Sequence, residues 1–156
     1  MVFMGDDDRA IAINRRANFE YHIDETYEAG MVLVGTEVKS LRDGKANLSD
    51  AFGRVKGNAI YLLNLHITPY GKAARDNHEP TRTRKLLLHK SEIERLRGKT
   101  LEKGYSLIPL RMYWKNGVAK VLLGLGKGKK LHDKRADAKE KDAKRDMSRA
   151  LRASTK

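Results

Sequence analysis

The chain divides into a part that can build a hydrophobic core and a shorter part that cannot. The last aromatic ring is Trp114 and the last proline is Pro109, so the final thirty residues contain neither. Residues 127–156 carry twelve Lys and Arg against five Asp and Glu, a net charge of +7. A segment so charged and so poor in apolar residues cannot bury enough surface to fold alone. We therefore expect a flexible N-terminus over residues 1–10, one folded domain over 11–126 and a basic tail over 127–156.

The folded domain is predicted to be mainly β. Two dipeptides tolerate the positive φ angles of a two-residue hairpin turn, and they are Gly57-Asn58 and Asn116-Gly117. Short apolar or alternating runs flank these turns and also occur upstream, over residues 19–26, 31–34, 52–56, 59–67, 105–114 and 118–125. Short strands with few helices favour a small antiparallel β-barrel, closed or partly open. A four- or five-stranded sheet with helices on one face is the alternative.

Short helices are expected beside these strands. Ser91 and Glu94 have the spacing of a capping box, and residues at helical spacing follow them until Gly98. Residues 37–42 form a second candidate helix, which Gly44 would close. The domain is thus expected to carry two or three short flanking helices.

The segment 69–83 has no core pattern and is expected to be an exposed loop. Four side chains within it or next to it could meet a phosphate group, and they are Arg75, His78, Arg82 and Arg84. Their role is predicted from charge alone.

The net charge predicts a polyanionic partner. The chain carries 33 Lys and Arg against 20 Asp and Glu, a formal net charge of +13. Nucleic acid and an anionic membrane surface both fit such a charge. No apolar run approaches the ~20 residues of a bilayer crossing, and the tail lacks the apolar face of a membrane-bound helix.

The acidic start of the chain does not resemble a secretory signal. With no cysteine in the sequence, we expect a cytoplasmic protein that binds nucleic acid.

The tail is predicted to be disordered when free and helical when docked. The pairs Asp137–Lys141 and Glu140–Lys144 have acid-before-base spacing, but each stabilises a helix by only roughly 0.2–0.5 kcal/mol. That is too little to offset helix nucleation without an apolar face. The preceding GKGKK at 126–130 either contacts phosphate or serves as a flexible linker, and the surrounding positive charge favours phosphate contact.

No residue pattern favours catalysis. His132 and Asp133 could form part of a nuclease site, but neighbours on a tail provide neither a pocket nor a positioned partner for proton transfer. His66 lies in an apolar run and is expected to be a core or half-buried residue. No histidine pair has metal-ligand spacing, so no metal and no other cofactor is expected.

Aromatic rings in the first strands could stack on unpaired bases or could belong to the core instead. They are Phe19, Tyr21, Tyr27, Phe52 and Tyr61.

Seven segments, in order along the chain, match one known family. They are INRRA at 13–17, YEAG at 27–30, GTEVKSLR at 35–42, KAN at 45–47, PTRTRKLLL at 80–88, YWKN at 113–116 and GKKLHDKR at 128–135. In these segments the chain resembles the SsrA-binding protein family, also called small protein B. The resemblance implies an OB-type β-barrel with flanking helices.

The resemblance also implies a function without catalysis. Members of this family bind the tRNA-like end of transfer-messenger RNA and deliver it to stalled ribosomes for trans-translation, in which the unfinished peptide is tagged and released. The expected partners are therefore transfer-messenger RNA (SsrA) and the stalled ribosome, at its decoding centre and mRNA channel. The tail would occupy the empty mRNA channel as a helix.

The matching positions suggest which residues carry these roles. Positions that resemble the RNA-binding face of the family are Asn14, Tyr21, Glu28 and Leu87, with basic contacts at Lys120, Lys127, Lys129 and Lys130. The ribosome-contacting motif of the tail is resembled by His132, Asp133, Lys134 and Arg135. From the residues alone, a structural ribosomal-type RNA-binding protein remains the alternative function.

Overall fold

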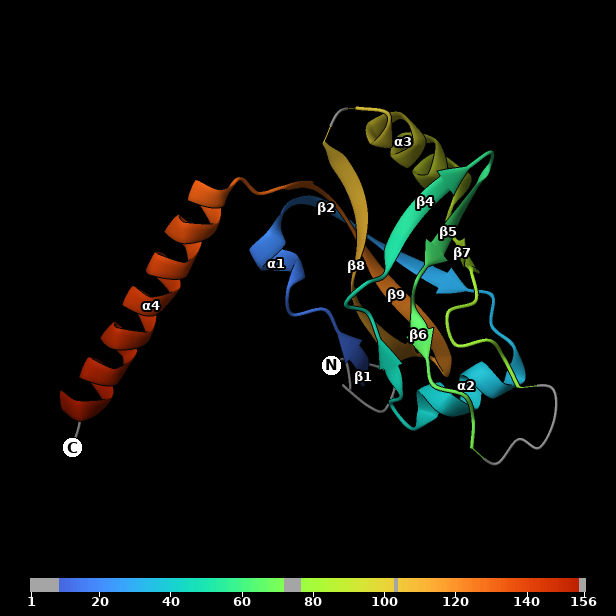
Figure 1. Cartoon of the computed structure of the whole chain (residues 1–156), viewed down its shortest axis with the longest axis horizontal. Coiled ribbons are helices and arrows are strands. Elements are labelled where there is room, and N and C mark those ends of the chain that lie inside the picture. Colours follow the sequence, from blue (N-terminus) through green and yellow to red (C-terminus); the bar gives the residue numbers. More distant parts are fainter. Residues whose placement is uncertain (1–8, 72–76, 103, 155–156) are drawn as a thin grey trace.

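The structure is a computed structural model of the whole chain, and it describes residues 9–71, 77–102 and 104–154. In this part of the chain a β-barrel carries three short helices, and a longer helix projects from one side (Figure 1). The strands are β1 (Ala10–Ile13), β2 (Tyr21–Met31), β3 (Ala46–Asn47), β4 (Phe52–Lys56), β5 (Ala59–Leu63), β6 (His66–Ile67), β7 (Arg84–Leu87), β8 (Tyr105–Lys115) and β9 (Val118–Gly128). The helices are α1 (Ala17–Glu20), α2 (Gly35–Arg42), α3 (Lys90–Thr100) and α4 (Leu131–Ser154).

The barrel closes through antiparallel pairing. Its strands follow one another in the order β8-β4-β5-β7-β2-β9, and β9 pairs back with β8. Strand β1 adds to β8 at one edge, while β3 and β6 form a separate two-stranded ribbon. The mainly β, OB-type barrel with short flanking helices is confirmed. The alternative of a four- or five-stranded sheet is wrong, because the pairings run from β8 through β4, β5, β7, β2 and β9 and return to β8.

Both predicted hairpin turns are present. Asn116 and Gly117 have φ angles of 50° and 74° between β8 and β9, and Gly57 has a φ of 61° between β4 and β5. Residues 21–26 of the first predicted run and Met31 of the second belong to one longer strand, β2, which continues through Gly30. A Cβ on Gly30 would lie 3.4 Å from the Leu87 Cβ, so this glycine marks a close approach rather than a break.

Both predicted helices are present, but the cap and the end of α3 differ from the prediction. Helix α3 begins at Lys90, and its cap comes from Glu92, whose carboxylate accepts the His89 N–H at 3.0 Å, rather than from Ser91 and Glu94. The helix passes through Gly98 to Thr100. Helix α2 covers the predicted residues 37–42, and Gly44 follows it with a φ of 70°.

The barrel interior holds apolar side chains and one buried ionic cluster. Ile60, Leu62, Leu86 and Leu123 are fully buried, as alternation along β-strands predicts for the inward face. Beside them Glu37 of α2 pairs with Arg84 of β7, and both side chains are completely buried. Arg82 donates to the same carboxylate at 2.6 Å.

This cluster corrects the prediction for the segment 69–83. His78 is buried, between the Thr36 hydroxyl at 2.9 Å and the Ile67 carbonyl at 2.8 Å. Arg84 is buried as well and Arg82 is half-buried, so these side chains stabilise the fold rather than contact phosphate. His66, expected to be a core or half-buried residue, is exposed because the alternation in β6 directs Ile67 inward. Arg75 and most of the N-terminus 1–10 lie outside the described residues, although Ala10 already belongs to β1.

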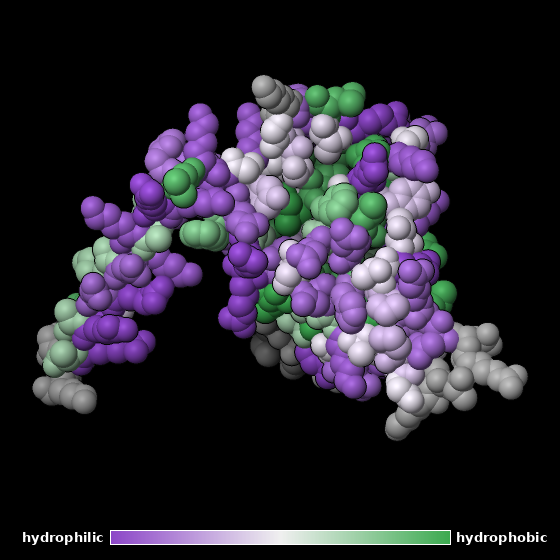
Figure 2. All heavy atoms as spheres, in the orientation of Figure 1, coloured by the Kyte–Doolittle hydropathy of each residue, from purple (hydrophilic) through white to green (hydrophobic). Residues whose placement is uncertain are grey.

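The C-terminal segment forms helix α4, which stands away from the barrel next to α1 (Figure 1). Its 24 residues span about 36 Å at 1.5 Å per residue. Hydrophilic side chains cover most of it (Figure 2), and the apolar Met147 is 68% exposed. The helix makes few contacts with the barrel that could stabilise it. Disorder of the tail in the free protein stays a prediction.

Candidate nucleic-acid interface

The pairing between neighbouring strands of the barrel is shortest where β4 meets β8. Gly53 and Leu107 are the only directly paired residues of these two strands within the described chain. A Cβ on Gly53 would lie 2.8 Å from the Leu107 Cβ, so the crossing requires glycine. The two strands diverge on either side of this pair and leave a seam between them. The seam opens into a pocket of about 530 Å³, the seam pocket.

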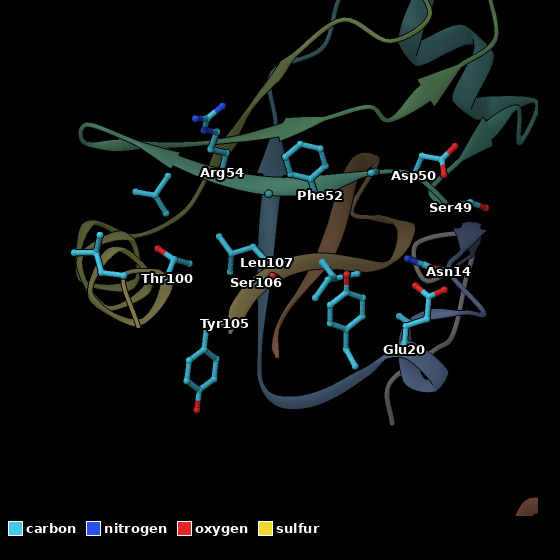
Figure 3. A pocket seen from close by; sticks show the side chains of 17 residues that line it. Asn14, Glu20, Ser49, Asp50, Phe52, Arg54, Thr100, Tyr105, Ser106 and Leu107 are labelled. Carbon is cyan, nitrogen blue, oxygen red and sulfur yellow. The ribbon is translucent and has the colours of Figure 1, made fainter. Parts of the chain in front are cut away.

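Two of the predicted RNA-binding residues, Asn14 and Tyr21, line this pocket. The Asn14 side-chain amide donates to the Pro109 carbonyl at 3.0 Å, which holds the loop after β1 against β8. In Figure 3, Asn14 and Glu20 lie at one end of the pocket and Phe52 lies between that end and Thr100. The Phe52 ring is 40% exposed, so it can stack on an unpaired base.

A second group of predicted residues meets on the outer wall of the barrel. Gly30 of β2 pairs with Leu87 on one side and with Lys120 on the other. A Cβ on Gly30 would be 3.6 Å from the Lys120 ammonium, so Leu87 and Lys120 flank a gap left by the missing side chain. Leu87 is 53% exposed, and Glu28 lies on the same strand as Gly30, two residues before it.

Glu28 is held in a charged form suited to recognition. The Tyr113 hydroxyl donates a hydrogen bond to it, and the Lys115 ammonium lies 3.2 Å from it. The hydrogen bond from Tyr113 lowers the pKa of Glu28, partial burial opposes this, and Lys115 and Lys120 lower the pKa further. A carboxylate beside an exposed leucine can accept from base or ribose donors, which a purely cationic surface cannot do.

The basic residues at the end of β9 and just after it differ in their surroundings. Lys127, in β9, lies with its ammonium 4.7 Å from the centre of the Tyr105 ring, at one end of the seam pocket. Lys130 is exposed. Lys129 is enclosed, with its side chain only 8% exposed and its ammonium bound to Asp137 and, at 2.6 Å, to the Asn18 carbonyl.

The predicted ribosome-contacting motif forms the first turn of α4. Asp133 accepts the Lys130 N–H at 3.4 Å and lies 3.6 Å from His22, so it caps the helix and ties it to β2. Burial by itself would raise the pKa of Asp133, but the charge of His132 and the contacts with His22 and Lys130 outweigh it and lower the pKa.

The other members of the motif differ in exposure, since Lys134 is half-buried and His132 and Arg135 are exposed. Lys134 lies 5.6 Å from the centre of the Phe19 ring, in a cation–π arrangement. The His132 ring lies 3.0 Å from Asp133, and Arg135 extends into solvent. The motif therefore combines residues that position the helix with residues that it presents to solvent.

Within residues 9–71, 77–102 and 104–154, no helix is both long and apolar enough to cross a bilayer. In the same part of the chain, no three His, Asp or Glu side chains lie close enough together to hold a metal ion.

Sequence reasoning missed several residues of these surfaces. Ser49, Asp50 and Tyr105 line the seam pocket, and Asn18 and Asp137 enclose Lys129. No local pattern identifies them, because each gains its place through strands or helices that are far apart in the chain.

Comparison with known proteins identifies the family. A family model described as SmpB protein matches residues 11–153. This chain belongs to the SmpB family. The resemblance noted in the seven sequence segments is therefore confirmed.

Its relatives match along nearly their whole length. An SsrA-binding protein of Geobacter sulfurreducens is 59% identical over 149 residues, covering 96% of this chain and 97% of the relative. An SsrA-binding protein of Bacillus subtilis is 56% identical over 148 residues and covers 95% of both chains. A solved chain described as "tmRNA-SmpB: a journey to the center of the bacterial ribosome" is 54% identical, covers 77% of this chain and 85% of its own, and has a TM-score of 0.66.

Proposed function

We propose that this chain binds the tRNA-like domain of SsrA RNA (transfer-messenger RNA) and delivers it to stalled ribosomes for trans-translation. The observation that carries the proposal is the convergence of Glu28, Leu87 and Lys120 around Gly30, on one outer wall of the barrel. Relatives at 56–59% identity are named SsrA-binding proteins, and a similar solved chain is described together with tmRNA and the ribosome. The chain acts in the cytoplasm as a binding protein, without catalysis and without a cofactor.

Capture of the RNA belongs to the barrel in this proposal. Leu87 supplies apolar contact, Glu28 accepts from ribose or base donors, and Lys120 and Lys127 meet phosphates. Asn14 and Tyr21 contribute through the seam pocket, and Lys129 and Lys130 through the start of the tail. The tail helix, led by residues 132–135, enters the empty mRNA channel beyond the decoding centre.

The partner is tested by recovering the protein from cells and sequencing the RNA bound to it. We expect SsrA RNA to be enriched over tRNA and ribosomal RNA. Ribosomal RNA recovered in fixed proportion to ribosomes would support a structural ribosomal-type protein and overturn the proposal.

The binding face is tested by two matched substitutions. Leu87→Ala removes an exposed apolar side chain from the proposed face, and Val118→Ala removes one of similar exposure, 50% against 53%, at the β8–β9 turn. We expect only Leu87→Ala to weaken binding to the tRNA-like domain, by roughly tenfold for about 1–2 kcal/mol of buried apolar contact. Equal binding by both variants would contradict the assignment of this face.

The tail is tested by cutting the chain after Lys130. This cut leaves β9 complete through Gly128 and keeps the backbone hydrogen bond from Lys129 to Glu20, so the barrel stays intact. We expect the shortened protein to bind free SsrA RNA and to fail in peptide tagging on stalled ribosomes. Normal tagging by the shortened protein would refute the role of the tail.

A further inference from the structure

A row of basic and aromatic side chains crosses three neighbouring strands of the barrel. Arg54 of β4 lies directly opposite Tyr61 of β5, and Tyr61 lies directly opposite Lys85 of β7. Directly opposite residues in antiparallel strands share a face. Lys56 follows Arg54 by two positions and lies on the same face, because side chains alternate along a strand. These three strands run side by side in the barrel wall (Figure 1).

The row borders a hollow in the surface. Arg54, Lys56 and Tyr61 line a depression of about 410 Å³, together with Leu63 and Thr83. Tyr61 is half-buried and forms an aromatic part of the lining, whereas Arg54 and Lys56 are exposed. Across two strand spacings, Arg54 and Lys85 are separated by about 10 Å.

The cations of this row have no internal counterion. Within the described residues, the side chains of Arg54, Lys56 and Lys85 make no ion pair with a carboxylate. Other basic residues of the barrel do pair, as Arg95 does with Glu25 and Lys115 with Glu28. Arg54 and Lys56 line the hollow, and Lys85 lies opposite Tyr61 on the neighbouring strand. Unpaired cations gathered on one face present a concentrated positive charge, which is the electrostatic signature of a phosphate-binding surface.

The row is continuous with the proposed RNA-binding face. Lys85 and Leu87 are two positions apart on β7, so both side chains point away from the core, and both are exposed. Leu87 in turn lies opposite Gly30, which lies opposite Lys120. At its other end the row reaches Arg54, which also lines the seam pocket.

We infer that Arg54, Lys56 and Lys85 form a binding site for the phosphate backbone of the same RNA that docks at Leu87, with the Tyr61 ring against a ribose or base between the phosphates. The inference rests on the proposed function, since it extends that interface across β5 to β4. The site joins the Leu87 face to the seam pocket, so one RNA can follow the barrel wall from Lys120 to Arg54.

The test measures binding of the tRNA-like domain of SsrA RNA to the full chain over a range of salt concentrations. The variant is Arg54→Ala with Lys85→Ala. Its charge-matched control is Arg42→Ala with Lys45→Ala, two exposed cations at the end of α2 and just after it. Each lost phosphate contact should reduce the slope of log affinity against log salt by roughly 0.7–0.9. We expect the first variant to lose roughly 1.4–1.8 in slope and the control to retain the wild-type slope.

A third variant separates the ring from the charges. Tyr61→Leu keeps an apolar side chain at the same position on the outer face but removes the aromatic ring, so affinity should fall severalfold with the salt slope unchanged. Melting curves of all variants establish that the barrel remains folded.

The outcomes distinguish the two proposals. If the wild-type chain prefers SsrA RNA and the Arg54→Ala, Lys85→Ala variant has the slope of the control, the inference is overturned while the proposed function stands. A loss seen only with ribosomes, and not with the isolated RNA, overturns it too. If the wild-type chain shows no preference for SsrA RNA, the proposed function itself fails.

Discussion

Replacing Glu37 by glutamine should strongly destabilise the barrel. The Glu37 carboxylate is fully buried and accepts from Arg82 at 2.6 Å, from the Val34 N–H at 2.9 Å and from Arg84. Arg84 is also fully buried, and its remaining donors reach the carbonyl of Leu65 and, at 3.2 Å, that of Pro80. In Glu37→Gln the guanidinium of Arg84 keeps its charge and loses its buried counterion.

The expected size of the effect follows from this burial. Removing one partner of a buried ion pair costs about 3–5 kcal/mol, because the other charge stays buried without compensation. Domains of this size are stable by only about 5–15 kcal/mol. Each kcal/mol shifts the midpoint of thermal unfolding by roughly 3–5 °C at about 120 residues, so the melting temperature should fall by on the order of 10–20 °C.

The assay is thermal unfolding followed by circular dichroism, with Glu25→Gln as the matched control. Glu25 also pairs with an arginine, but the side chain of its partner Arg95 is 54% exposed, and water can take over the contacts of such a pair. We expect a far smaller change in the control. Equal changes in the two variants would refute the view that burial gives the Glu37 cluster its energetic weight.

The same cluster predicts how stability depends on pH. Burial by itself would raise the pKa of Glu37, but the hydrogen bonds from Arg82 and Val34 and the charge of Arg84 lower it. Since the folded pKa lies below the unfolded value of about 4.3, the cluster contributes fully above that value. Its contribution declines as the pH falls through the unfolded pKa and is lost below the folded pKa. Denaturant unfolding between pH 3 and pH 7 should give a flatter curve for Glu37→Gln than for the wild type, and parallel curves would contradict the argument.

Three further predictions concern the end of the barrel and the tail. Lys130→Ala should lower the slope of log affinity against log salt for RNA binding by roughly 0.7–0.9, and Lys129→Ala should lower it less. Lys129→Ala should instead change the distance between barrel and tail measured by spin labelling, and Asp137→Asn should do the same. Identical behaviour of the two lysine variants would contradict this difference. Gly126→Ala should reduce the melting temperature, because its new Cβ would lie 2.6 Å from the backbone carbonyl oxygen of His22, and an unchanged melting temperature would mean that β2 can move aside. Cutting the chain after Lys130 should remove little helical circular dichroism from the free protein if the tail is disordered in solution, and a loss matching the full length of α4 would show a stable helix instead.

The outer surface of the barrel shows why only part of the site is predictable. Leu87, Glu28 and Lys120 were assigned through the family resemblance, and the register of β7, β2 and β9 brings them together. The row from Arg54 to Lys85 has no local signature, because it depends on the pairing of three strands. Lys129 and Lys130 are neighbours with the same chemistry, yet only Lys129 is enclosed, since Asp137 and Asn18 approach it from two different helices.

Local chemistry determined the hairpins and the division of the chain. Asn116-Gly117 and Gly57-Asn58 specify turns because few residues tolerate positive φ, whatever the rest of the chain does. The tail stays outside the core because its residues offer too little apolar surface to bury. Arg84 is the opposite case: its charge suggested an exposed phosphate contact, and only the packing of α2 against β7, 47 residues apart at Glu37, gave it a buried counterion. A charged side chain can be buried when such a partner is present, and that partner is set by tertiary structure rather than by neighbouring sequence.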